Sequence, residues 1–255
     1  MKTPAQMFDL TGRVAVVTGG SRGIGKSLVY GLAAAGADVV VASRKLAACE
    51  EVAADVVAKT GRRALPVQCN VTHWADCDRL YETVYREFGA CHVLVNNAGS
   101  SPLYPDLVSI TEAYYDKVHA LNARGPFRLS ALFGTRMAAG EGGSIINIST
   151  LGSLISDPKS LVYTMAKAGM NNMTIGLAQA FAPKVRVNCV CPGAFATDVA
   201  DNAYWFDGSA EQRMRIGQPD EAVGIVLYLA SDAASFTNGA IIEVSRAGWR
   251  RDAAG

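Results

Sequence analysis

The run VAVVTGGSRGIG at residues 14–25 passes from five apolar or β-branched residues straight into a glycine-rich turn. Its first part predicts a short buried strand, and a helical pattern follows the turn. Such a turn lets backbone N–H groups approach a pyrophosphate, and the helix N-terminus adds favourable electrostatics. We therefore predict a dinucleotide-binding loop, with a plain tight turn as the simpler alternative. The loop consists of Gly19, Ser21, Arg22, Gly23, Ile24 and Gly25.

Outward from this turn, short apolar runs alternate with helical patterns. We expect strands at residues 13–18, 37–42, 64–69, 93–96, 143–148, 185–190 and 240–244. We expect helices at residues 26–35, 45–59, 74–88, 112–137 (in one piece or two), 161–181 and 219–230. Apolar strands that alternate with helices are buried on both faces, which is typical of a mostly parallel sheet with helices on each side. The sequence thus predicts an α/β, doubly wound Rossmann fold of about seven strands, as one domain over residues 1–255.

The predicted second strand ends in Ser43, Arg44 and Lys45. In a Rossmann fold this end faces the adenosine ribose, where a carboxylate would bind the 2′-hydroxyl and favour NAD. Here a guanidinium is present instead, and Arg22 lies in the glycine-rich loop. Two cations near a 2′-phosphate would make charge-assisted hydrogen bonds. Ser43 and Arg44 therefore favour NADP(H), while NAD(H) stays possible. The alternative is that Arg44 and Lys45 only begin a solvated helix.

Net charge, apolar runs and cysteine spacing limit which partners the protein could bind and in which compartment it could work. The 255 residues carry a net charge of +1, which gives no electrostatic case for nucleic acid or an anionic membrane. No apolar h-region follows Met1, and no run approaches the roughly 18 apolar residues of a bilayer span. The six cysteines lack paired metal-ligand spacing, so we expect reduced thiols in a cytoplasmic protein without a metal site. A redox or metal role of Cys189 and Cys191 is the lesser alternative.

Tyr163 and Lys167 are four residues apart at the start of a predicted helix, so they share one face. A phenol with a pKa near 10 is a poor acid–base catalyst at neutral pH, but a neighbouring ammonium stabilises the phenolate. The pair is therefore suited to passing a proton to or from a carbonyl oxygen while a hydride moves on carbon. Many surface helices carry the same spacing, so the pair alone is a weak signal.

Four motifs in order supply the missing context. They are TGGSRGIG at residues 18–25, NNAG at 96–99, YTMAK at 163–167 and PGAFAT at 192–197. Together they resemble the short-chain dehydrogenase/reductase family of the small single-domain type, and within it the 3-oxoacyl-carrier-protein reductases. The resemblance runs from about Leu10 to Val244.

The resemblance implies roles residue by residue. Tyr163 would be the acid–base, Lys167 would lower its pKa and bind the nicotinamide ribose, and Asn122 would hold a proton-relay water. It also implies cofactor contacts from the ends of three further strands: Asn70 and Val71 at the adenine, Asn97, Ala98 and Gly99 along the adenosine and ribose, and Pro192, Gly193 and Thr197 at the nicotinamide.

The catalytic serine of the family has no unambiguous counterpart. It usually lies thirteen residues before the tyrosine, a position that Thr150 occupies here. Alignment on the following glycine, Gly152, selects Ser149 instead, and we favour Ser149 slightly. Both side chains carry a hydroxyl donor, so the chemistry survives either way. Adjacent side chains at a strand end point to opposite faces, so we expect one of the two to reach the substrate.

Substrate specificity should come from Ser100–Asp106, Leu151–Val162 and Asp198–Ile216. The last stretch contains Tyr204-Trp205-Phe206, which would form either a lid over an apolar substrate or a packing contact. The sequence does not choose between 3-oxoacyl thioesters, steroids, sugars or polyols and simple ketones.

The leading hypothesis is an NADPH-dependent reductase that acts on a small-molecule ketone or 3-oxoacyl compound. A first alternative is an NAD-linked alcohol, polyol or hydroxysteroid dehydrogenase, against which Ser43 and Arg44 argue. A second is a catalytically silent nucleotide sensor, against which Tyr163, Lys167 and Asn122 argue. Dehydratase or epimerase chemistry would usually need a longer C-terminal part. The resemblance also implies a homotetramer, or a homodimer, with helices around residues 112–137 and 161–181 at the interface.

Overall fold

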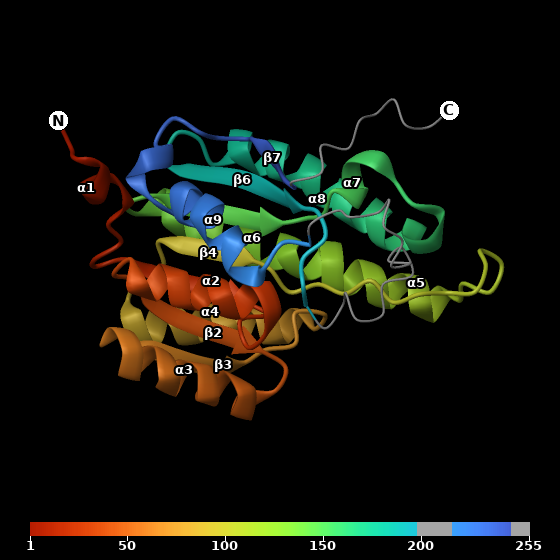
Figure 1. The fold of residues 1–255 in the computed structure, drawn as a ribbon, viewed down its shortest axis with the longest axis horizontal. Helices are drawn as coiled ribbons and strands as arrows, with labels where there is room; N and C mark the ends of the chain where they lie inside the picture. The colour runs from red at the N-terminus through yellow and green to blue at the C-terminus, as the bar shows by residue number, and fades with distance from the viewer. Residues whose placement is uncertain (198–215, 246–255) are drawn as a thin grey trace.

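Seven runs rich in Val, Ile and Ala form one parallel sheet in a computed structural model that describes residues 1–197 and 216–245 (Figure 1). The strands are β1 (Val14–Thr18), β2 (Asp38–Ser43), β3 (Ala64–Gln68), β4 (Val93–Asn96), β5 (Gly143–Ile148), β6 (Val185–Pro192) and β7 (Ile241–Val244). Their order across the sheet is β3-β2-β1-β4-β5-β6-β7, and each neighbouring pair is parallel. The predicted α/β, doubly wound fold is confirmed.

Helices cover both faces of the sheet (Figure 1). They are α1 (Pro4–Phe8), α2 (Gly23–Ala34), α3 (Leu46–Thr60), α4 (Trp74–Phe88), α5 (Glu112–His119), α6 (Gly125–Ala139), α7 (Gly152–Ile155), α8 (Leu161–Ala180) and α9 (Val223–Ala230). Short turns of other helix types are η1 (Ala120–Arg124), η2 (Pro158–Ser160), η5 (Pro219–Ala222) and η6 (Asp232–Ala234).

Successive residues of β1 enter two different cores, because side chains alternate across a strand. Ala15 and Val17 pack in a core with residues of α2, α3 and α9. Val14 and Val16 pack in a second core with residues of α4, α6 and α8. This two-sided burial explains why the strands are continuously apolar in sequence.

The helical stretch that we predicted over residues 112–137, in one piece or two, forms two helices joined by a turn. Helix α5 ends at His119, the π-helical turn η1 follows, and α6 begins at Gly125. A π-turn holds one residue more than an α-turn, and such turns are frequent at functional sites. Asn122 lies in this turn and is fully buried.

Other elements differ from the prediction by smaller amounts. Helix α2 begins at Gly23 rather than residue 26, so the last glycines of the turn form its first helical turn. Strand β6 continues to Pro192 rather than ending at residue 190. The short helices α1 and α7 were not predicted, since five and four residues are too few for a hydrophobic period to appear.

The topology brings the candidate residues to one edge of the sheet. All carboxyl ends of a parallel sheet lie on the same edge, and the chain leaves β1 and β4 in opposite directions across the sheet. Ligands of doubly wound folds bind in the crevice at such a switch point. The candidates follow the carboxyl ends of β1 (Gly19–Gly25), β2 (Ser43, Arg44), β3 (Asn70, Val71), β4 (Asn97–Gly99), β5 (Ser149, Thr150) and β6 (Pro192, Gly193).

All six cysteines are buried and free of disulfides. Across residues 1–197 and 216–245, no three His, Cys, Asp or Glu side chains are grouped to hold a metal ion. None of the helices in these two segments combines the length and apolar content that a bilayer span requires.

Candidate active site

The glycine-rich turn after β1 is packed so closely that side chains are excluded. A Cβ atom on Gly25 would lie 2.2 Å from the carbonyl oxygen of Gly19, and Gly19 has a φ of +66°. Gly23 also has a positive φ, and Thr197 lies over it at 3.3 Å from an ideal Cβ. The turn therefore presents backbone rather than side chains at the N-terminus of α2, as pyrophosphate binding requires.

Asn97 fixes this turn to the end of β4. Its side-chain amide donates to the carbonyl of Thr18 at 2.9 Å and lies 3.3 Å from that of Gly19. The Thr18 hydroxyl accepts in return from the backbone N–H groups of Asn97 and Ala98, at 3.0 and 3.1 Å. These bonds close the switch point between β1 and β4, so Asn97 stabilises the strand-end turn, the structural alternative that its position in the sequence also indicated.

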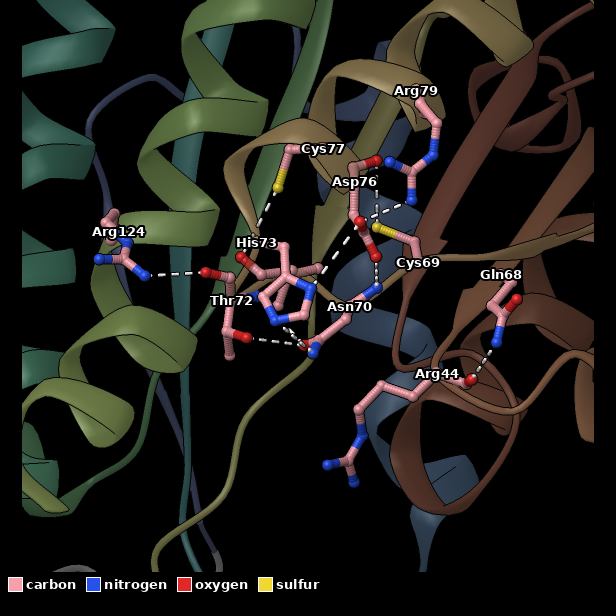
Figure 2. Close-up of polar contacts among 11 residues, drawn as sticks. Arg44, Gln68, Cys69, Asn70, Thr72, His73, Asp76, Cys77, Arg79 and Arg124 are labelled. Carbon is pink, nitrogen blue, oxygen red and sulfur yellow. Dashed lines mark hydrogen bonds and ion pairs between the residues drawn. The ribbon is translucent and has the colours of Figure 1, made fainter. Parts of the chain in front are cut away.

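The end of β2 faces the same turn. The hydroxyls of Ser21 and Ser43 are 2.8 Å apart, so the glycine-rich turn and β2 are joined beside the predicted ribose site. Gln68, the last residue of β3, donates to the carbonyl of Arg44 at 3.1 Å. In Figure 2 the Arg44 side chain extends away from Gln68. Arg22 precedes α2 in the glycine-rich turn, and Arg44 follows β2. The bond between Ser21 and Ser43 brings these two loops together.

The predicted adenine loop is held by its own side chains (Figure 2). Asn70 accepts at Oδ1 from the N–H and the hydroxyl of Thr72, at 3.3 and 2.9 Å. The Asn70 N–H donates to the carboxylate of Asp76 at 2.9 Å, and Arg79 donates to the same carboxylate at 2.6 Å. Arg124 of η1 donates to the carbonyl of Thr72 at 2.8 Å, so the loop also contacts the π-turn.

The π-turn places Asn122 next to Lys167. An ideal Cβ on Gly99 would lie 3.0 Å from Asn122 Oδ1 and 3.3 Å from Lys167 Nζ, so both polar groups lie against Gly99, which leaves no room for a side chain. Asn122 donates to the carbonyl of Ser100 at 3.0 Å and to that of Val118 at 3.0 Å. It also accepts from the Ser100 N–H at 3.3 Å. Residues 99–100 therefore run directly past the predicted relay group.

Lys167 is 2% exposed, and its ammonium donates to the carbonyl of Ile148 at 2.7 Å. Burial lowers the pKa of Lys167 from 10.5 to about 8, because the charged form loses its hydration. Its ammonium lies 5.9 Å from the centroid of the Tyr163 ring. The two predicted catalytic side chains thus share one face of α8.

We expected Lys167 to lower the pKa of Tyr163. Burial acts in the other direction and raises the pKa of Tyr163 from 10.0 to about 12, and the Thr150 side chain opposes this in part. The Lys167 ammonium donates to the Ile148 carbonyl. The effect of Lys167 on the phenol stays a prediction.

Thr150, rather than Ser149, lies close enough to lower the pKa of the Tyr163 phenol. The Ser149 hydroxyl is turned the other way, 3.2 Å from the Ser153 hydroxyl and 3.2 Å from the carbonyl of Lys167. The two neighbours point to opposite sides, as expected at a strand end. This geometry runs against the slight preference for Ser149 and agrees with the thirteen-residue spacing.

Behind Thr150 lies a buried polar network. Ser153 donates to the carbonyl of Thr150 at 2.6 Å and accepts from the Asn171 amide at 2.8 Å. The thiols of Cys189 and Cys191 lie 3.4 and 3.9 Å from Asn171 Oδ1. Both thiols are thus buried within hydrogen-bonding distance of the Asn171 side chain.

The loop after β6 is described as far as Thr197. An ideal Cβ on Gly193 would lie 2.8 Å from the Ser245 hydroxyl, so Gly193 is packed against the segment that follows β7. Residues 198–215 lie outside the described part, and with them the Tyr204-Trp205-Phe206 stretch and all but the last residue of the predicted substrate stretch Asp198–Ile216.

These residues fit a nicotinamide adenine dinucleotide. The glycine turn leaves room for a pyrophosphate, Arg44 and Arg22 would face a 2′-phosphate, and Asn122 and Lys167 would lie at the nicotinamide end. Four residues that support the site were given no role in the sequence analysis: Thr18, Ser153, Asn171 and Tyr104. Each forms a hydrogen bond with a residue far away in the sequence. Only the polarity of Asn171 in an apolar run hinted at such a role.

Comparisons with known proteins show which family this chain resembles. Residues 19–246 match the family model described as enoyl-(acyl carrier protein) reductase. A short-chain type dehydrogenase/reductase of Picea abies is 34% identical over 254 residues, covering 92% of this chain and 92% of its own. A 3-oxoacyl-[acyl-carrier-protein] reductase of Synechocystis is 36% identical over 249 residues, covering 93% of this chain and 97% of its own.

A solved structure shows the same likeness. The L-sorbose reductase of Gluconobacter frateurii, in complex with NADPH and L-sorbose, superimposes with a TM-score of 0.87 at 26% identity. The match covers 94% of this chain and 97% of that one.

Proposed function

This chain belongs to the short-chain dehydrogenase/reductase family and is an NAD(P)-dependent oxidoreductase, and we propose that it reduces ketones or 3-oxoacyl compounds with NADPH. One observation carries the proposal: Tyr163 and buried Lys167 share one face of α8, with the Lys167 ammonium 5.9 Å from the centroid of the Tyr163 ring, and buried Asn122 lies beside Lys167. This group lies at the same edge of the sheet as the glycine-rich turn.

A nicotinamide bound here supplies the hydride, and the protein's own groups handle the substrate oxygen. In the proposed reaction the Thr150 hydroxyl donates a hydrogen bond to the carbonyl oxygen and polarises the bond. Tyr163 then gives its proton to the same oxygen as the alcohol forms. Asn122 orders the backbone at Ser100 and the surroundings of the Lys167 ammonium, from which a proton can return to Tyr163.

The protonation state of Tyr163 supports the reducing direction. A pKa of about 12 keeps the phenol protonated at pH 7, which is the form that can donate to a carbonyl oxygen. We propose carbonyl reduction as the direction of use, together with the preference for NADPH argued from the end of β2.

The preference for NADPH rests on the end of β2. Ser43 is hydrogen-bonded to Ser21, and Arg44 follows where a carboxylate would select NAD. The structural relative from Gluconobacter frateurii is complexed with NADPH, which supports the same choice here. An NAD-linked alcohol, polyol or hydroxysteroid dehydrogenase is the runner-up.

Exposed apolar side chains support assembly from copies of this chain. Phe127 on α6 and Met165 and Ile175 on α8 are 46%, 46% and 44% exposed. These are the helices for which the family resemblance implies contacts, so we propose a homotetramer or homodimer of one-domain chains. The six free thiols favour the cytoplasm as its compartment.

The first experiment is a fluorescence titration of the protein with NADPH and with NADH, followed by turnover assays on ketones and 3-oxoacyl thioesters. We expect tight NADPH binding, weaker NADH binding and carbonyl reduction that Tyr163→Phe lowers at least 100-fold, as expected for loss of an acid–base. Tyr228→Phe, which removes a hydroxyl bonded to Thr237 on α9's side of the sheet, is the matched control. A preference for NADH would favour the dehydrogenase, and binding of neither dinucleotide would favour the silent sensor.

A further inference from the structure

The segment at residues 100–110 contains no helix or strand, yet it runs beside the candidate catalytic groups. Its start is fixed by Asn122, which bonds both the N–H and the carbonyl of Ser100. A segment without regular structure needs side-chain contacts to keep one position. The contacts made by two tyrosines meet this need.

The hydroxyl of Tyr104 connects this segment to the beginning of the catalytic helix. It donates to the carbonyl of Pro158 at 2.5 Å and accepts from the N–H of Leu161 at 2.9 Å. Leu161 is the first residue of α8, so its N–H has no acceptor within the helix. One side-chain oxygen thus joins two segments that are more than fifty residues apart in sequence.

A second tyrosine holds Tyr104 in place. The rings of Tyr104 and Tyr114 meet edge to face, with centroids 5.8 Å apart and an interplanar angle of 88°. The Tyr114 hydroxyl donates to the carbonyl of Pro102 at 2.5 Å. Residues 100–104 are therefore anchored at three points, by Asn122, by Tyr114 and by the start of α8.

The position of this anchored segment gives it a functional meaning. Its first residue contacts Asn122 beside Lys167, and its fifth contacts Leu161, two residues before Tyr163. Residues 100–104 therefore span the candidate site from its relay group to the helix turn that carries the phenol.

We propose that Tyr104 is a positioning residue that sets substrate specificity. Its hydroxyl fixes the separation between residues 100–104 and the start of α8, and this separation sets the width of the substrate site. The proposal rests on the proposed carbonyl reduction for its functional part. It does not depend on which dinucleotide is bound.

Tyr104→Phe tests the proposal, because it keeps the ring against Tyr114 and removes only the hydroxyl. We would measure kcat and KM with NADPH for cyclohexanone and for the larger 2-decalone. Loss of two hydrogen bonds predicts that the ratio of the two kcat/KM values changes about tenfold, mainly through KM. The Kd for NADPH should stay within twofold, and Tyr228→Phe should change neither quantity. An unchanged ratio, or an equal loss in Tyr228→Phe, overturns the proposal.

Amide hydrogen exchange at Leu161 tests the positioning role of Tyr104 without an activity assay. In Tyr104→Phe the amide of Leu161 should exchange at least about tenfold faster than in the wild type, since it loses its acceptor. Tyr228→Phe should leave that rate unchanged. If the wild type reduces no ketone, the proposed function fails, and the exchange rate alone then decides whether Tyr104 holds the segment. An unchanged Leu161 rate in Tyr104→Phe overturns the positioning role in either case.

Discussion

Gly25 in the first turn of α2 lies against the carbonyl oxygen of Gly19, and an added Cβ would be 2.2 Å from that oxygen. No side-chain rotation relieves such a contact, because both partners are backbone. We predict that Gly25→Ala destabilises the protein by about 1–3 kcal/mol, as overpacking does, and weakens NADPH binding at least tenfold. Urea unfolding and fluorescence titration measure the two effects.

Gly224→Ala is the matched control, since an added Cβ there meets no atom within 4 Å. Gly224 lies inside α9, where alanine is the better helix former by about 1 kcal/mol. The control should bind NADPH normally and unfold at equal or higher urea. Normal NADPH affinity in Gly25→Ala would remove the glycine turn from the dinucleotide site.

The position of Thr150 close to Tyr163 predicts which hydroxyl serves the reaction. Thr150→Val keeps the shape of the side chain and removes the donor, so kcat should fall about 100-fold, the usual loss for one donor to a developing oxyanion. Thr150→Ser should keep most of the activity. Ser149→Ala should have a small effect, because its hydroxyl bonds Ser153 and the Lys167 carbonyl. The reverse order of the Thr150→Val and Ser149→Ala effects would assign the role to Ser149.

The guanidinium of Arg44 predicts the cofactor preference. A hydrogen bond to a charged group contributes about 1.5–3 kcal/mol, so Arg44→Ala should weaken NADPH binding about 10- to 100-fold. NADH, which lacks the 2′-phosphate, should bind as it does to the wild type. Parallel titrations with both dinucleotides measure the ratio. Arg86→Ala, on the exposed end of α4, is the charge-matched control and should leave both affinities unchanged.

The lowered pKa of Lys167 predicts a change of stability with pH. Between pH 8 and 10.5 the unfolded chain binds more protons at Lys167 than the folded protein, so stability from this group rises with pH. Relative to Lys167→Met, the wild type should gain about 2 kcal/mol between pH 7 and pH 10. The raised pKa of Tyr163 makes stability fall as the pH rises, but this effect acts only above pH 10.

Urea unfolding of both proteins at pH 7, 8, 9 and 10 gives the difference directly. Lys45→Met removes an exposed lysine and should run parallel to the wild type over this range. A constant difference between wild type and Lys167→Met would mean that Lys167 is hydrated in the folded protein.

The strands were predictable because their residues are chosen for burial on both faces. The run of valines in β2 and the Ile-rich β5 can serve only as buried strands, and the residues after them then lie at one edge by topology alone. The interruption at η1 was not predictable, since a π-turn changes the helical period over too few residues for a sequence pattern to show.

The choice between Ser149 and Thr150 depended on side-chain direction, which two neighbouring hydroxyl residues do not reveal in sequence. Likewise, Tyr104 had the same sequence signal as any tyrosine in a loop. Its importance arises from meeting Pro158 and Leu161, which only the folded chain brings near. The raised pKa of Tyr163 also follows from burial in the folded chain.

The π-turn at η1 makes the site sensitive to chain length as well as to residue identity. Removing Ala123 would let α5 and α6 join as one regular α-helix, in which each residue turns by about 100°. Asn122 could then no longer keep its contacts with Ser100 while α6 kept its own packing. A deletion of one residue, with every catalytic side chain retained, would thus separate binding from turnover.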